Sequence, residues 1–150
     1  MQVIAVGNAF CGDDGVGAAV LAQLAAVLET ASLRLADLGT DALALVEMLR
    51  ADEPCVVVDA ARMGQAPGTV AAFRPREARL RIRGDGLSLH GLGLAEAFAL
   101  AGQLGRMPAD LLVVGVEPAG VTPGTGLSDA VAAAVPRVVQ IIQAEVQRHE

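Results

Sequence analysis

The chain has 150 residues, a length that favours one domain, so we expect residues 1–150 to form a single domain. It carries a net charge of −6, all 11 of its basic residues are arginine, and its only aromatic residues are 3 phenylalanines. This acidic, aromatic-poor composition excludes a typical nucleic-acid-binding protein and predicts an aliphatic core.

The cysteine content and the distribution of apolar residues indicate in which cellular compartment the protein is expected. Cys11 and Cys55 are too few for a disulfide framework or a cysteine-based zinc site. The N-terminus has no basic, signal-like segment, and no apolar run approaches the roughly 18 residues of a membrane span. We therefore expect a cytoplasmic, monomeric protein with neither a membrane nor a nucleic acid as partner.

The predicted elements alternate between strands and helices. In chain order we expect a strand at Gln2–Val6, a helix at Asp14–Glu29, a strand at Leu33–Leu38, a helix at Asp41–Arg50, a strand at Cys55–Val58, a strand at Thr69–Phe73, a helix at Leu92–Leu104, a strand at Leu111–Val116 and a helix from Ser128 to about Arg148. This alternation predicts a three-layer α/β fold: a twisted, mostly parallel sheet with helices on both faces and a flavodoxin-like or phosphorylase/hydrolase-like topology.

Local signals refine these elements. Cys55–Val58, an uninterrupted apolar run that leads into Asp59, is typical of a central parallel strand. Thr40 and Ser128 are expected to cap the helices that follow them. Pro136 predicts a kink inside the last helix.

The first loop, V-G-N-A-F-C-G-D-D-G-V-G at Val6–Gly17, has the glycine spacing of a phosphate-binding loop but the opposite charge. It lacks the Lys and Ser or Thr that a phosphate loop needs, and Asp13 and Asp14 would repel a phosphate. We expect its first glycines to make a sharp turn. Gly15 and Gly17 would let the following helix pack closely on the sheet.

Polar residues follow the predicted strands at the edge where doubly wound sheets bind ligands. Asp13 and Asp14 follow the first strand, Asp59 ends the third, and His90 precedes a helix. Each has a structural alternative: a helix cap for Asp13, the helix dipole for Asp14, a turn for Asp59 and a surface position for His90. Together, two carboxylates and an imidazole suit a divalent metal with open coordination positions.

Cys11 and the arginine-rich segment are not part of this candidate site. Cys11 has no basic neighbour in sequence to lower its pKa, so we interpret it as a small neutral residue. The segment Arg74–Arg83 holds five of the 11 arginines and is interpreted either as a solvated loop or as a docking patch for an acidic partner.

Several motifs resemble those of the hydrogenase maturation endopeptidases, over nearly the whole chain. The resemblance rests on the order and spacing of V-G-N-x-x-x-G-D-D-G-V-G at Val6–Gly17, D-x-G-T at Asp37–Thr40, V-V-D-A-x-x-x-G at Val57–Gly64, His90 in S-L-H, V-G-V-E-P at Val114–Pro118 and G-x-G-L-S at Gly124–Ser128. It implies the same mostly parallel α/β sheet.

The resemblance also implies a site. Family members bind a metal through an acidic residue of the glycine loop, an Asp after the third strand and a His, which correspond to Asp14, Asp59 and His90. These three residues are the expected catalytic and metal-binding set, while Asp13 is expected to be a helix cap. The first ligand is Glu in some relatives and Asp here, which is about one methylene shorter.

The implied activity is a single cut. The endopeptidase would remove the C-terminal extension of a nickel–iron hydrogenase large-subunit precursor after nickel insertion. The substrate would supply the nickel as recognition element, so the protease's own site could be empty when purified. Either metal-bound water or water activated by an Asp14 or Asp59 carboxylate would attack the peptide bond. The chain has no H-E-x-x-H and no motif around a catalytic serine.

Two other functions remain open at this point. One is a flavodoxin-like binding module, which would hold a nucleotide or flavin in the first loop. The other is a non-catalytic metal-binding or nickel-delivery protein, which would bind nickel without cleaving a precursor. If the arginine-rich segment docks the precursor, replacing Arg76, Arg79 and Arg81 by Ala should raise KM.

Overall fold

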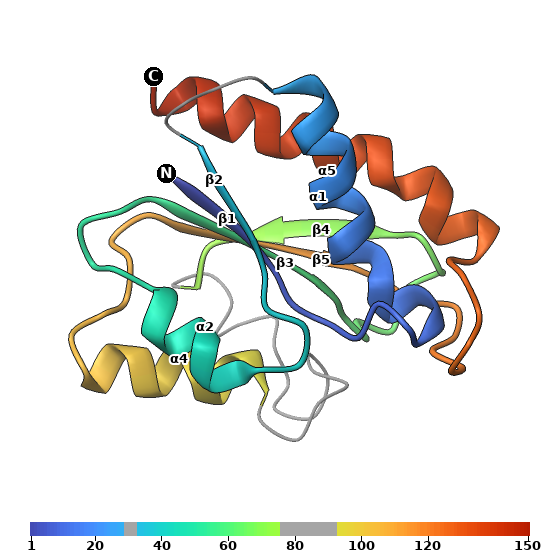
Figure 1. The fold of residues 1–150 in the computed structure, drawn as a ribbon, viewed down its shortest axis with the longest axis horizontal. Helices are drawn as coiled ribbons and strands as arrows, with labels where there is room; N and C mark the ends of the chain where they lie inside the picture. The colour runs from blue at the N-terminus through green and yellow to red at the C-terminus, as the bar shows by residue number, and fades with distance from the viewer. Residues whose placement is uncertain (29–32, 76–92) are drawn as a thin grey trace.

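The computed structural model describes residues 1–28, 33–75 and 93–150 (Figure 1). Its centre is a five-stranded sheet with the strand order β2-β1-β3-β5-β4. The strands are β1 (Gln2–Ala5), β2 (Arg34–Asp37), β3 (Cys55–Ala60), β4 (Val70–Phe73) and β5 (Leu111–Val116). Four of them are parallel, and β4 runs antiparallel to β5 at one edge, which confirms the expected mostly parallel sheet.

The two central strands show why the apolar runs of the sequence form the middle of the sheet. Every residue of β3 and of β5 is buried. A parallel strand covered on both faces must be apolar on both, so its sequence is continuous rather than alternating. β1 pairs with β3, as expected, and places Val6 next to the carboxyl end of β3, where the Val6 amide donates to the Val58 carbonyl at 3.1 Å.

Helices cover both faces of the sheet (Figure 1). Helices α1 (Val16–Val27) and α5 (Asp129–Arg148) cover one face, and the shorter α2 (Ala42–Met48) and α4 (Leu94–Gln103) cover the other. The two resulting cores consist almost entirely of Val, Leu, Ile and Ala, as the composition predicts. Within the described ranges, no helix combines the length and apolar character needed to cross a membrane.

Of the caps predicted for α2 and α5, one is wrong and one is confirmed. Asp41 caps α2 by accepting a hydrogen bond from the Ala44 amide at 2.9 Å, so the prediction of Thr40 as the cap is wrong by one residue. Ser128 caps α5 as predicted, with its Oγ 3.4 Å from the Val131 amide nitrogen. α5 continues through Pro136, whose side chain is exposed.

The first helix begins later than predicted. A short 3-10 turn, η1 (Gly12–Gly15), precedes α1 and contains both aspartates of the glycine loop. A Cβ atom on Gly17 would lie 2.9 Å from the Ala5 Cβ, so this glycine lets α1 pack against β1 as expected. Gly15 instead faces the backbone of Ala9, within the loop.

Candidate functional site

The glycine loop follows β1 at the carboxyl edge of the sheet and turns sharply into η1. Gly7 has φ +127°, and a Cβ there would lie 2.3 Å from the Asp14 carbonyl oxygen. Gly12 has φ +54°, and a Cβ there would lie 2.8 Å from the Gly120 carbonyl oxygen. Both positions therefore require glycine, which confirms the predicted turn.

Asp14 lies in η1, folded back over Gly7. Its carboxylate is buried, and Oδ2 accepts a hydrogen bond from the Asn8 amide at 2.7 Å. The Oδ1 atom is 3.1 Å from the position a Gly7 Cβ would take. Because Asn8 lies three residues after the end of β1, its hydrogen bond holds the Asp14 carboxylate at the carboxyl edge of the sheet.

Asp59 lies near the carboxyl end of β3 and is 1% exposed. Neither of its carboxylate oxygens has a hydrogen-bond partner among the described residues. Burial raises the pKa of Asp59 well above its usual range, the Asp14 carboxylate raises it further, and the Ala60 amide opposes both effects only in part. Burying a carboxylate without hydrogen-bond partners costs folding free energy, and such groups occur mainly at functional sites or where an ion binds.

The fold brings two of the three predicted site residues together. The pairing of β1 with β3 places Gly7, and with it Asp14, next to Asp59, and the Asp14 charge acts on the Asp59 pKa. His90 lies outside the described residues. The structure therefore describes the paired carboxylates but not the imidazole.

Asp13 does not cap the helix that follows it, contrary to our prediction. Neither η1 nor α1 has a side-chain cap. The Asp13 carboxylate instead accepts hydrogen bonds from the segment before α5: from the Ser128 amide at 2.6 Å, the Ser128 hydroxyl at 2.9 Å, the Ala119 amide at 2.8 Å and the Gly120 amide at 3.2 Å. Burial would raise the pKa of Asp13, but these hydrogen bonds outweigh it and lower the pKa.

A further buried acid, Glu117, was missed by sequence reasoning, although it lies in the V-G-V-E-P motif. The Glu117 carboxylate, at the end of β5, accepts a hydrogen bond from the Met63 amide. The Met63 sulfur lies 3.5 Å from the position of a Cβ on Gly115, the strand partner of Asp59. Glu117 thus fixes the segment after β3 and places the Met63 thioether beside β5, at the position paired with Asp59.

A pocket opens beside Asp59 on the sheet face covered by α2 and α4. It is lined by the ends of β1 and β3 and by the starts of the two helices, through Val6, Gly39, Thr40, Asp41, Ala42, Leu45, Asp59, Gly93, Leu94 and Ala97. Most of these residues are apolar or small, so Asp59 presents its carboxyl group to a largely apolar space. The open volume is about 20 Å³, room for about one water molecule, so the pocket limits the access of water to Asp59.

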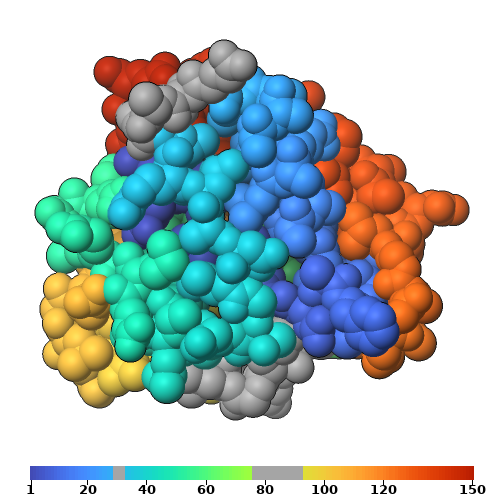
Figure 2. Space-filling view, in the orientation of Figure 1, coloured from blue at the N-terminus to red at the C-terminus, as the bar shows by residue number. Residues whose placement is uncertain are grey.

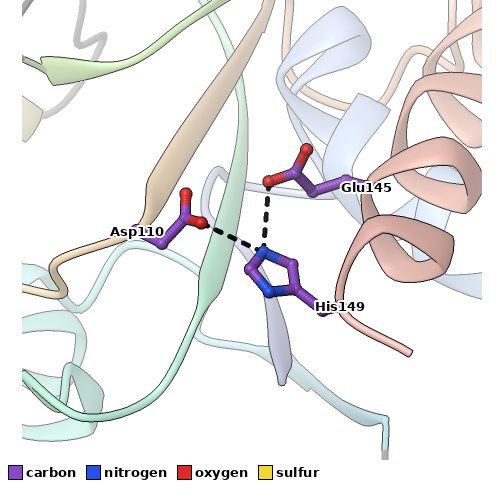
Figure 3. A group of neighbouring side chains, drawn as sticks. All are labelled: Asp110, Glu145 and His149. Carbon is purple, nitrogen blue, oxygen red and sulfur yellow. Dashed lines mark ion pairs between the residues drawn. The ribbon is translucent and has the colours of Figure 1, made fainter.

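Two acids and a histidine also lie together at the opposite edge of the sheet, where the parallel strands begin (Figure 3). The ring of His149 lies between Asp110 and Glu145, with Nε2 3.2 Å from the Asp110 carboxylate and 3.5 Å from that of Glu145. Arg74 and Arg148 form ion pairs with both acids. Since two guanidinium groups already neutralise the carboxylates, we interpret this group as an ion-pair network rather than a metal centre.

This network also bears on the arginine-rich segment. Arg74, its first residue, is engaged with Asp110 and Glu145 and is therefore not part of a free docking patch. The rest of the predicted patch, including Arg76, Arg79 and Arg81, lies outside the described residues. Its docking role stays a prediction.

The two cysteines have different surroundings. Cys55 is buried in β3, and burial raises the pKa of its thiol to about 12, with the Glu53 charge adding to the effect. Cys11 is partly exposed in the glycine loop. The Cys55 thiol is thus chemically inert.

Known proteins are similar to this chain over most of its length. A family model described as hydrogenase maturation protease matches residues 19–145. The hydrogenase expression/formation protein HupD of Thiocapsa roseopersicina is 35% identical over 117 residues, which are 77% of this chain and 53% of HupD. Protein FrxA of Pyrococcus furiosus is 28% identical over 141 residues, which are 93% of this chain and 99% of FrxA. The chain thus spans about half the length of HupD and nearly all of FrxA.

Solved structures share the fold. The hydrogenase maturating endopeptidase HybD of E. coli superposes with a TM-score of 0.84 at 24% identity, over 99% of this chain and 94% of HybD. The [NiFe] hydrogenase maturation protease HybD of Thermococcus kodakarensis superposes with a TM-score of 0.73 at 26% identity, over 96% of this chain and 98% of that protein. The mostly parallel α/β sheet is therefore a fold that these proteins have in common.

Proposed function

Because the chain belongs to the hydrogenase maturation protease family, we propose that it is an endopeptidase that removes the C-terminal extension of a nickel–iron hydrogenase large-subunit precursor. The observation that carries this proposal is the pair of buried carboxylates, Asp14 and Asp59, at the carboxyl edge of the sheet beside a pocket. A cytoplasmic location and a monomeric state remain expectations that belong to the same proposal.

Nickel enters the proposal as part of the substrate. The residues fit a divalent cation, because both oxygens of the buried Asp59 lack hydrogen-bond partners among the described residues and the neighbouring Asp14 is a second oxygen donor. His90 would add an imidazole, the ligand type that nickel accepts readily. A bound cation would polarise the scissile carbonyl or acidify a water molecule.

The residues of the chain would supply positioning and proton transfer. In hydrolysis, the oxygen of a water molecule bonds to the carbonyl carbon, the C–N bond breaks, and the proton lost by the water passes to the leaving amine. A carboxylate of the Asp14–Asp59 pair would accept that proton and then donate it to the amine. The raised pKa of Asp59 suits this exchange, because it moves proton affinity towards the operating pH.

The hydrogen bonds around Asp14 fit a positioning role. The Asn8 amide fixes one oxygen of the carboxylate, and Gly7 leaves room for the other. Asp13 anchors the same turn to the segment before α5. The turn is thus held on both sides, which limits the rotation of Asp14 away from Asp59.

The test is cleavage of purified precursor, followed by mass spectrometry. Asp14→Asn, Asp59→Asn and His90→Ala should each lower the cleavage rate by about 100-fold or more, the usual effect of losing a proton-transfer or charge-stabilising group. Asp52→Asn is a matched control, because Asp52 is exposed in the turn before β3, away from the carboxyl edge. It should leave the rate unchanged.

The substrate's metal state separates the alternatives. Nickel-loaded precursor should be cut and nickel-free precursor should not. Equal cleavage of both would contradict recognition through nickel while leaving the protease assignment intact. Stoichiometric nickel binding with no cleavage of either form would instead favour a nickel-delivery protein.

A further inference from the structure

Four large apolar side chains are exposed in the part of the chain that the structure describes: Phe10 at 67%, Val27 at 49%, Leu43 at 60% and Leu104 at 59%. Two of them, Phe10 and Leu43, lie at the carboxyl edge of the sheet, in the glycine loop and in the first turn of α2. Val27 and Leu104 lie at the far ends of α1 and α4, whose first residues are near the site.

Phe10 is held in solvent by a fixed backbone. Its amide donates to the Asn8 Oδ1 at 3.0 Å, and its carbonyl accepts from the Gly124 amide at 2.8 Å. The ring borders Gly124, with Cζ 3.7 Å from the position of a Cβ there. These hydrogen bonds fix the backbone position from which the exposed ring projects.

The position of Phe10 is close to the proposed chemistry. Asn8, which accepts from the Phe10 amide, donates its own amide to Asp14. The other two phenylalanines contribute to the core: Phe73 is buried and Phe98 packs against the cluster under α2 and α4. Phe10 is 67% exposed and so gains only a small part of the roughly 2 kcal/mol that full burial of such a ring is worth.

Leu43 lies in the first turn of α2, a helix whose start lines the pocket. It follows Ala42, which lines the pocket with Asp59, and it is two residues before Leu45, which lines it as well. Figure 2 shows the glycine loop in blue and the α2 region in teal on one face of the molecule. Each segment adjoins the carboxylate pair: Phe10 through Asn8, which hydrogen-bonds Asp14, and Leu43 through Ala42, which lines the pocket with Asp59.

We propose that Phe10, in the glycine loop, and Leu43, in the first turn of α2, are apolar substrate contacts that pack against apolar side chains of the precursor segment carrying the scissile bond. The inference rests on the proposed function and deepens it, because it assigns recognition to two residues outside the Asp14, Asp59 and His90 set. Aromatic anchors next to a rigid backbone lose little conformational entropy on binding, which makes Phe10 the stronger contact.

The test compares Phe10→Ser and Leu43→Ser with Val27→Ser and Leu104→Ser, the same kind of change at the opposite ends of α1 and α4. Steady-state cleavage of nickel-loaded precursor and the Kd of its complex, from surface plasmon resonance, are measured for each variant. Phe10→Ser should raise KM and Kd roughly tenfold and Leu43→Ser roughly threefold, with kcat within about twofold of wild type. The two controls should match wild type.

Two results would overturn the inference: unchanged KM and Kd in Phe10→Ser and Leu43→Ser, or equal losses in the controls. Thermal unfolding of all four variants should match that of the wild type, because every substituted side chain is exposed. If the wild type binds the precursor without cutting it, the proposed protease activity fails, and the Kd values still decide whether Phe10 and Leu43 dock the precursor.

Discussion

Asp13 and Asp59 are both buried carboxylates, but their surroundings have opposite effects on ionisation. Asp13 accepts hydrogen bonds from Ser128, Ala119 and Gly120, and these lower its pKa in spite of burial. Asp59 has no hydrogen-bond partner among the described residues, and burial with the nearby Asp14 charge raises its pKa. The first carboxylate stabilises the fold, and the ionised form of the second lowers its stability.

The same substitution should therefore have opposite effects at these two positions. Asp13→Asn should lower the free energy of unfolding by about 3 kcal/mol, because an amide nitrogen would face donors that now meet a carboxylate oxygen. Asp59→Asn should raise it on the order of 1 kcal/mol at neutral pH, because a neutral amide is cheaper to bury than an unpaired charge. Urea unfolding in the presence of a chelator measures both.

The contrast also separates stability from catalysis. Asp59→Asn should be more stable and inactive, which a merely structural residue would not be. Destabilisation of Asp59→Asn by more than about 1 kcal/mol would show that its carboxylate stabilises the fold, contrary to our interpretation. Retained stability in Asp13→Asn would show that its hydrogen bonds contribute little.

Individual residues were predictable from sequence only where local chemistry decides their role. Gly7 and Ser128 act within a few residues of their own position, in a turn and a helix cap, and both predictions are confirmed. Asp13 has a partner 115 residues away, so the local capping preference predicted a role that Asp13 does not have. The role of Glu117 in holding Met63 likewise depends on two strand ends that only the fold brings together.

At the scale of elements, the central strands were predictable because burial on both faces leaves a continuous apolar run. β5 begins and ends where the sequence predicts, at Leu111 and Val116. Helix starts were less certain, since Thr40 and Asp41 are both good caps and only backbone geometry selects Asp41. The 3-10 turn η1 was not predicted, because its aspartates and glycines also suit the first turn of an α-helix.

The packing of α1 on the sheet gives an element-scale prediction. Gly17→Ala would place a methyl group 2.9 Å from the Ala5 Cβ and 3.3 Å from the Val58 carbonyl oxygen. We expect a loss of about 1–3 kcal/mol from overpacking, larger than the roughly 1 kcal/mol that alanine gains over glycine in a helix. Because α1 begins at the Asp14 turn, cleavage activity should fall as well.

Gly102→Ala is the matched control for this change. Gly102 lies in α4, and nothing comes within 4 Å of a Cβ placed there. The substitution should stabilise the protein by up to about 1 kcal/mol through helix propensity alone. Thermal unfolding of the two variants should therefore shift in opposite directions, and a shared direction would contradict close packing as the role of Gly17.

At the scale of the whole molecule, the two edges of the sheet have different tasks. The carboxyl edge of the parallel strands holds Asp14, Asp59 and the pocket. At the opposite edge, Arg74 after β4, Asp110 before β5 and Glu145 in α5 join three elements through ion pairs. The rule that parallel sheets bind ligands at their carboxyl edge predicted the location of Asp14 and Asp59 from sequence. No local sequence signal predicts the pairing of Arg74 with Glu145, which are 71 positions apart.

The acid side of the stability profile follows from the groups with lowered pKa values. Burial would raise the pKa of Glu145, but Arg148 and Arg74 outweigh it and lower the pKa, as the hydrogen bonds do for Asp13. Groups with a lowered pKa stabilise the fold above their ordinary values, here 3.8 for Asp13 and 4.5 for Glu145. That stabilisation is lost as the pH falls through the lower folded-state pKa values.

The pKa of Asp59 is raised rather than lowered on folding, so its contribution to stability depends on pH in the opposite direction. Its contribution to stability is fully present below the ordinary pKa of 3.8 and is lost as the pH rises towards the raised folded-state pKa. The advantage of Asp59→Asn over wild type should therefore be near zero at about pH 3.5 and grow towards about pH 7 in chelator-treated protein, measured by urea unfolding at each pH. A constant difference across that range would contradict a raised pKa, and disappearance of the advantage on addition of Ni²⁺ would indicate that a cation compensates the Asp59 charge.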